Sequence, residues 1–74
     1  MANFALNLAI DKAGGRVPLS KALGVERQAV YNWEQQGWVP APRAIEIERK
    51  FGVNALLLIK PELRAVITSL SPAR

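Results

Sequence analysis

The sequence predicts an all-α fold, a compact bundle of about five short helices in one domain, residues 1–70, followed by a flexible tail at residues 71–74. Apolar residues recur three and four positions apart along most of the chain, which places them on one face of a helix. Glycine and proline stand where these stretches end and begin. Because the chain has only 74 residues, it can bury about 60% of its unfolded surface, so a partner would add stability.

The first helix is predicted to begin after Asn3, a favourable N-cap residue, and to run to Ala13. The Gly14–Gly15 pair ends it. Its predicted inward stripe consists of Leu6, Ile10 and Ala13. Phe4 and Leu8 fall on the opposite side, where they can pack on the C-terminal segment, meet a second subunit, or remain partly exposed in a frayed N-terminal turn.

The second helix has Pro18 in its first turn and ends by Gly24. Leu19 and Leu23 lie four positions apart on its inner face. Gly24 indicates a tight turn, because a residue without a Cβ atom adopts positive φ at little cost. Val25 then plugs the corner. Two short helices joined in this way and crossing at about 90–120° are typical of a helix-turn-helix.

The third helix is predicted to span about Arg27 to Gln36 and to stop at Gly37. Its apolar residues, Val30 and Trp33, share one face and complete a common seam with the second helix. When this face is turned inward, the opposite face of the third helix is polar.

That outer face carries Gln28, Tyr31 and Asn32, with Arg27 on its flank. Gln and Asn amides can pair bidentately with adenine, Arg can pair with guanine, and a Tyr ring can contact a sugar or a thymine methyl group. A helix face that meets only water more often carries Lys and Glu at four-residue spacing. We therefore predict that these residues read base edges of double-stranded DNA.

Residues around the two helices are predicted to hold the phosphates of the same duplex: Arg16, Lys21, Gln35 and Arg43. Ten basic and six acidic residues give a formal net charge of +4, which favours a polyanionic partner. Charge alone is a weak signal, since many small proteins are basic for solubility. Arg43 falls near the start of the next predicted helix, whose own N–H groups can bind a phosphate.

The second half begins with an extended connector over residues 38–42, from which Trp38 is predicted to cover the core rather than contact bases. Pro42 opens a fourth helix that includes Arg43 and ends at Phe51, before Gly52.

Asn54 is a suitable cap for a short apolar helix over residues 55–59. One face of this segment is expected to reach the core, and the other either meets a second copy or also covers the monomer core. Residues 61–70 include β-branched types, yet the spacing of their apolar residues favours a helix.

Composition excludes several function classes. The chain has no Cys and no His, so it lacks disulfides, thiol nucleophiles, ordinary zinc sites and imidazole acid–base chemistry. We expect no enzymatic activity, no cofactor, no metal and no small-molecule substrate. No apolar run approaches the roughly 20 residues of a membrane span, and the N-terminus lacks the pattern of a signal peptide. We therefore expect a cytoplasmic protein without a membrane partner.

Several stretches of the chain together resemble a known group of regulators: Gly14–Gly15, Leu19–Val25, Ala29–Val30, Asn32–Trp33, Val39–Pro40 and Ala44–Arg49. The chain is similar to the lambdoid-phage Cro repressors of the all-helical type and to the closely similar YdaS-like antitoxin family. The resemblance covers roughly residues 10–60.

This resemblance implies a lambda-repressor-like DNA-binding domain that acts as a transcriptional repressor, commonly as a homodimer on a pseudo-palindromic operator. It assigns base reading to the same four residues, Arg27, Gln28, Tyr31 and Asn32. The position after Val25 is usually Ser or a similar capping residue in these families, whereas this chain has Glu26, whose carboxylate repels a phosphate. Glu26 can instead favour the helix dipole or accept a hydrogen bond from cytosine N4.

We therefore expect a sequence-specific regulator that binds double-stranded DNA as a homodimer, with the third helix in the major groove. The alternative is an antitoxin or adaptor module that binds a protein through the apolar C-terminal segment. RNA binding is less favoured, since the sequence shows no exposed aromatic pair on which bases would stack.

Overall fold

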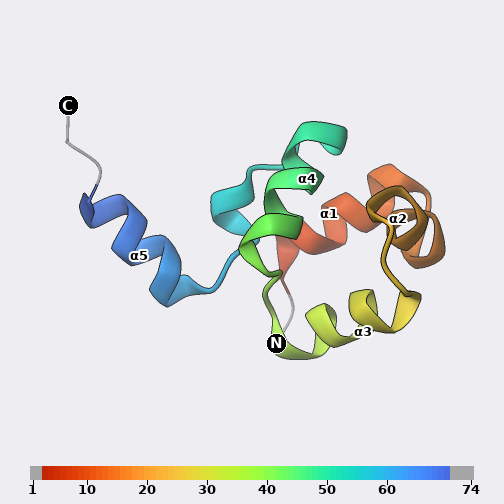
Figure 1. Cartoon of the computed structure of the whole chain (residues 1–74), viewed down its shortest axis with the longest axis horizontal. Coiled ribbons are helices and arrows are strands. Elements are labelled where there is room, and N and C mark those ends of the chain that lie inside the picture. Colours follow the sequence, from red (N-terminus) through yellow and green to blue (C-terminus); the bar gives the residue numbers. More distant parts are fainter. Residues whose placement is uncertain (1–2, 71–74) are drawn as a thin grey trace.

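The computed structural model describes residues 3–70, and within this range every regular element is a helix, as predicted. In chain order these are α1 (Phe4–Ala13), α2 (Arg16–Leu23), α3 (Arg27–Gln36), α4 (Ala41–Phe51), the short 3-10 helix η1 (Ala55–Leu57) and α5 (Pro61–Leu70). Helices α1 to α4 gather together, whereas α5 extends away from them (Figure 1). The predicted tail, residues 71–74, lies outside the described residues, as do residues 1–2.

The core is formed by apolar side chains from α1 to α4, from the α3–α4 connector and from the segment after η1. Its largest fully buried side chains are Leu6, Leu19, Val30, Val39, Ile47 and Leu58. Burying a side chain of this size stabilises the fold by about 1.5–3 kcal/mol relative to leaving it in water. The four helices of the bundle therefore share one core, and α2 and α3 pack directly on each other within it.

Asn3 caps α1 as predicted and also ties that helix to two distant segments. Its Oδ1 accepts a hydrogen bond from the backbone N–H of Leu6 at 3.0 Å. Its Nδ2 donates to the carbonyl oxygens of Gly37 and Leu57, each at 3.1 Å. One side chain thus joins the start of α1 to the end of α3 and to η1.

The inward face of α1 differs in part from the prediction. Its buried residues are Ala5, Leu6 and Ala9. Ile10 and Ala13 are only partly buried against the core. Because α1 packs against both α2 and α4, small alanine side chains are needed where the helices approach one another. Phe4 and Leu8 lie away from the core as predicted, with 82% and 39% of their surface exposed.

The turn between α2 and α3 is consistent with the predicted helix-turn-helix. Gly24 has φ 68° and ψ 32°, in the left-handed region that glycine adopts most readily. A Cβ atom added there would meet no atom within 4 Å, so the backbone conformation, and not lack of space, favours glycine. Val25 follows and packs, partly buried, against the core. Leu19 and Leu23 are buried on α2, as expected.

The α3–α4 connector is shorter than predicted, because α4 begins at Ala41 and not at Pro42. Pro42 is tolerated inside the first turn, where its missing N–H costs nothing. Trp38 is only half-buried, whereas Val39 is fully buried and its N–H donates to the Leu58 carbonyl at 2.7 Å. Val39 is therefore the main core contact of the connector, and Trp38 covers the core only in part.

The expected short helix over residues 55–59 is a 3-10 helix that ends earlier, at Leu57. The predicted cap is confirmed, since Asn54 Oδ1 accepts from the backbone N–H of Leu56 at 2.9 Å. Leu58 and Ile59 then enter the core, while Leu57 is half exposed. The segment therefore has one face on the core and one in solvent.

The helix favoured for residues 61–70 is confirmed as α5. Leu63, Val66 and Ile67 on this helix are 39%, 52% and 41% exposed. Within residues 3–70, the chain forms no helix with the length and apolar character that crossing a membrane requires.

Candidate nucleic-acid interface

The orientation of α3 is set by two buried residues. Val30 is fully buried and Trp33 is 5% exposed, and their three-residue spacing turns one face of α3 to the core. Gln28, Asn32 and Gln35 lie on other faces of the same helix and are exposed. The orientation predicted from the sequence, with the indole inward and the amides outward, is therefore confirmed.

All four residues predicted to read bases are exposed on α3: Arg27, Gln28, Tyr31 and Asn32. Gln28 Nε2 donates a hydrogen bond to Asn32 Oδ1 at 3.1 Å, across one helical turn. Among the described residues, this bond leaves the Oε1 atom of Gln28 to accept and the Nδ2 group of Asn32 to donate. An adenine edge in the major groove presents the complementary donor and acceptor.

A shallow hollow lies between α2 and α3 beside this face. Its lining consists of Val17, Ser20, Lys21, Val25, Glu26, Arg27 and Gln28. Lys21 and Arg27 are exposed and bring two cations next to Gln28. Glu26 occupies the N-cap position of α3, but its side chain makes no capping hydrogen bond. The start of α3 therefore combines two cations with one carboxylate in a groove open to solvent.

Arg16 is bonded within the chain rather than isolated at the surface. Its Nε donates to Glu34 Oε1 at 2.6 Å, and its guanidinium carbon lies 5.4 Å from the centroid of the Tyr31 ring. The hydrogen bond to Glu34, assisted by the charge of that carboxylate, raises the pKa of Arg16 above its ordinary value. Arg16 therefore connects the start of α2 to the outer face of α3.

Arg43 is also bonded within the chain. Its Nη1 donates to the backbone carbonyl of Leu23 at 3.2 Å and to Glu46 Oε1 at 2.8 Å. Since Leu23 is the last residue of α2, Arg43 ties the first turn of α4 to the helix end that precedes the turn. Its predicted phosphate contact is untested, whereas its link between α2 and α4 is present in the free chain.

Sequence reasoning missed both of these Arg–Glu pairs. The pair of Arg43 and Glu46 has the three-residue spacing of helix neighbours, so a local signal was available. The pair of Arg16 and Glu34 joins positions 18 residues apart on two helices, and no local pattern indicates it. Both pairs are partly exposed, so each contributes little to stability by itself.

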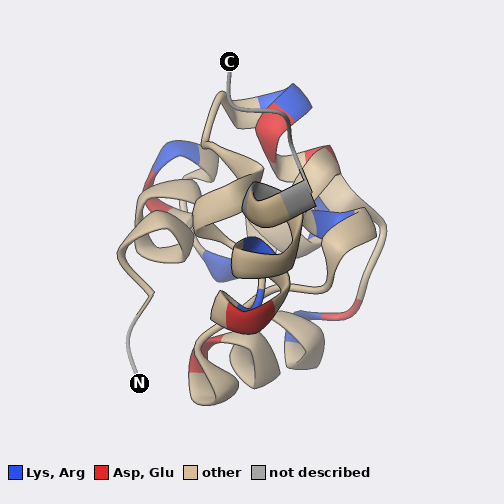
Figure 2. Cartoon of the chain, turned by 90° about the vertical axis from the view of Figure 1, so that its left-hand side faces the viewer, with Lys and Arg blue, Asp and Glu red and all other residues tan. Residues whose placement is uncertain are grey.

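Charge alone does not outline a binding face. Figure 2 shows Lys and Arg interspersed with Asp and Glu over several helices. Gln35 is exposed on α3 close in sequence to Glu34, and Lys21 is exposed on α2. The distinguishing feature of α3 is therefore its row of amides together with Tyr31, and the nearby cations supplement it.

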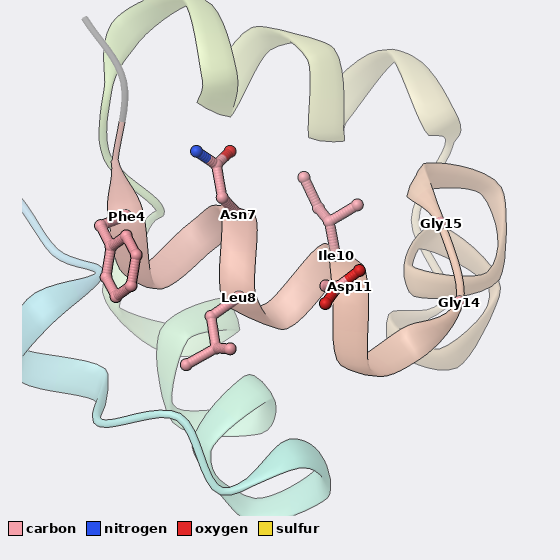
Figure 3. Close-up of a pocket in the computed structure, with 7 residues that line it drawn as sticks. All are labelled: Phe4, Asn7, Leu8, Ile10, Asp11, Gly14 and Gly15. Atoms are coloured by element: carbon pink, nitrogen blue, oxygen red, sulfur yellow. The ribbon is translucent and has the colours of Figure 1, made fainter.

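Another hollow runs along the outer side of α1 (Figure 3). It is lined by Phe4, Asn7, Leu8, Ile10, Asp11, Gly14 and Gly15. Asn7 and Ile10 point to one side of α1 and Leu8 to the other (Figure 3). Asp11 is the charged residue of this lining, and its carboxylate would repel a phosphate. We therefore do not include this hollow in the candidate interface.

Comparison with known families adds a second kind of observation. The model of a family described as bacterial toxin YdaS matches residues 6–54. The chain belongs to this family. The match includes α2, α3 and α4 together with the residues predicted to read bases, and it ends before η1 and α5. No curated protein and no solved structure matches the chain.

The family match confirms the YdaS-like part of the resemblance found in the sequence. The similarity to Cro repressors remains a prediction.

Proposed function

We propose that the chain is a sequence-specific double-stranded DNA-binding transcriptional regulator, Cro-like in its mode of action, that places α3 in the major groove. The observation that carries this proposal is the outer face of α3, where Gln28 and Asn32 are exposed and joined to each other while Trp33 is buried behind them. Protein–protein interfaces are depleted of charged and polar groups at their centres, whereas base readout requires amides and guanidinium groups.

In this proposal Gln28, Asn32, Tyr31 and Arg27 contact base edges, and Lys21 and Gln35 contact the phosphates on either side. A phosphate contact fixes the position of α3 on the duplex, and the base contacts select the sequence. Occupation of promoter DNA would then repress transcription.

A homodimer is part of the proposal, because one short helix reads too few base pairs to select a single operator. Two copies related by a twofold axis would place their α3 helices about 34–36 Å apart, so that they enter successive major grooves. The corresponding operator would be an inverted repeat with half-sites about 10 bp apart.

The proposal is tested by selecting bound sequences from a pool of random duplexes with the purified full chain. We expect recovery of an inverted repeat with the stated spacing, and loss of that enrichment with Asn32→Ala. Asn7→Ala, which removes an exposed amide from α1, is the matched control and should recover the same sequence. A pool that remains random after selection with the wild-type chain would contradict sequence-specific binding.

The second candidate function is a protein-binding module of a toxin or antitoxin system. It is favoured by the family description and by the exposed apolar side chains Leu63, Val66 and Ile67 on α5. The two functions separate in cells that produce the chain and show a growth or reporter effect. Lys21→Ala and Asn32→Ala should abolish that effect if DNA binding causes it, whereas Val66→Asp should abolish it if α5 binds a protein.

A further inference from the structure

Three residues form a cluster that joins the start of α2 to the outer face of α3. Arg16 is the first residue of α2, while Tyr31 and Glu34 lie on α3. The Nε of Arg16 donates to Glu34 Oε1 at 2.6 Å, and its guanidinium carbon lies 5.4 Å from the centroid of the Tyr31 ring. One guanidinium therefore contacts two side chains of the same helix face.

The spacing of the two α3 residues makes this arrangement possible. Tyr31 and Glu34 are three positions apart, so their side chains are neighbours along one side of the helix. A charge-assisted hydrogen bond of this length is directional and holds the plane of the guanidinium. A guanidinium within about 6 Å of an aromatic centroid is attracted to the ring. Glu34 thus fixes Arg16, and Arg16 in turn restricts the Tyr31 ring.

The ion pair also changes what Arg16 can contribute to binding a polyanion. The side chains of Arg16 and Glu34 are 48% and 21% exposed, so the pair presents a nearly neutral surface rather than a free cation. A phosphate contact by Arg16 would bring that phosphate close to the Glu34 carboxylate, which repels it. Tyr31, in contrast, is 42% exposed on the face that carries Gln28 and Asn32.

We propose that Arg16 is a positioning residue, held by Glu34, that sets the Tyr31 ring for contact with a base or sugar and makes no phosphate contact of its own. This inference rests on the proposed function, because the ring position matters for binding only if α3 meets DNA. It replaces the phosphate role that the sequence predicts for Arg16.

The test uses Arg16→Met/Glu34→Gln, which removes one positive and one negative charge and so leaves the net charge unchanged. We expect affinity for the selected duplex to fall about twofold to fivefold, the range of an exposed cation–π contact. Affinity for a random duplex, and the slope of log K against log salt, should stay unchanged. If Arg16 contacted a phosphate, both affinities would fall and the slope would decrease by about 0.9, which would overturn the proposal.

The chain offers a matched control in its other Arg–Glu pair. Arg43→Met/Glu46→Gln makes the same chemical change at a pair whose atoms are 2.8 Å apart, on α4. It should leave the ratio of the two affinities unchanged. Thermal unfolding of both variants is measured, so that a loss of affinity caused by partial unfolding is recognised as such.

A double-mutant cycle with Tyr31 makes the test specific. In a Tyr31→Ala chain, the change at Arg16 and Glu34 should cause no further loss on the selected duplex, because there is no ring left to position. An equal loss with and without the ring would overturn the proposed role. Arg16→Lys, which keeps the charge but not the planar group, should lose affinity as the paired change does.

A readout without DNA separates this inference from the proposed function. In the free chain, the ring proton shifts of Tyr31 should move toward unfolded values in Arg16→Met/Glu34→Gln but not in Arg43→Met/Glu46→Gln. Unchanged Tyr31 shifts in the first variant would overturn the inference while leaving DNA binding standing. A wild-type chain that binds no duplex would overturn the proposed function and the binding role of Tyr31 with it, whatever the shifts.

Discussion

Helices α3 and α5 each contain ten residues and each expose a long face, but the two faces differ in kind. On α3 the exposed side chains are amides and a tyrosine, and the opposite face is held by Val30 and Trp33 in the core. On α5 the exposed side chains include Leu63, Val66 and Ile67, and the helix extends away from the bundle (Figure 1).

This difference shows which helix the rest of the chain holds in place. An isolated helix of about ten residues is marginal in water, so its stability must come from packing. The bundle supplies that packing for α3 through Val30 and Trp33, and it supplies much less of it for α5. The family match follows the same division, since it contains α3 and ends at residue 54. A stable polar face on α3 is what reading a duplex requires.

The largest expected effect is on the residue that holds α3 in the core. Trp33→Ala should lower the free energy of unfolding by about 3–5 kcal/mol, because it removes a large buried side chain and leaves a cavity. Urea unfolding followed by circular dichroism measures this loss. A change below about 1 kcal/mol would mean that the indole does not anchor α3.

The next effect concerns the outer face of the same helix. Asn32→Ala should weaken binding to the selected duplex by about 1–3 kcal/mol, because a base loses its amide partner, and should leave binding to a random duplex nearly unchanged. Lys21→Ala should instead weaken both and decrease the salt slope by about 0.9. These affinities are measured by fluorescence anisotropy at several salt concentrations. Equal losses on both duplexes with Asn32→Ala would contradict base reading.

Asn3 connects the bundle to the end of α3, so its replacement sharpens the comparison at the level of stability. Asn3→Ala should lower the free energy of unfolding by about 0.5–2 kcal/mol, the usual range for loss of an N-cap, and toward the upper end because two further hydrogen bonds are lost. Asn54→Ala is the matched control, since Asn54 caps only η1. A thermal melt that ranks the control as the more damaging change would contradict this account of Asn3.

The smallest effect is expected on α5. Val66→Ala should change the free energy of unfolding by less than about 0.5 kcal/mol in dilute solution, because the side chain is half exposed. Unfolding is measured over a range of protein concentrations. A loss above about 1 kcal/mol would show that α5 is packed in solution and that the contrast with α3 does not hold.

Most of the fold follows from local patterns in the sequence. The ends of α2 and α3 at Gly24 and Gly37 were predictable, because glycine readily supplies the left-handed residue that ends a helix. The burial of Trp33 followed from its spacing with Val30. The same periodicity predicted which side chains of α3 are exposed, and so identified the candidate site.

The remaining features depend on how the helices meet. The sequence gives no local signal that Ala9 rather than Ile10 is buried on α1, since this depends on how closely α2 and α4 approach. The pairing of Arg16 with Glu34 depends on the same packing of separate helices. Val39 as the main core contact of the connector also follows from where Leu58 lies, far along the chain.

The central claim, that the outer face of α3 contacts a duplex, is tested most directly by NMR. The isotope-labelled full chain is titrated with the duplex recovered by selection, and the change in each backbone amide signal is measured. The account predicts the largest changes at Gln28, Tyr31 and Asn32, with a smaller change at Lys21 and little change along α5. Changes concentrated on residues 61–70, with α3 unaffected, would contradict it.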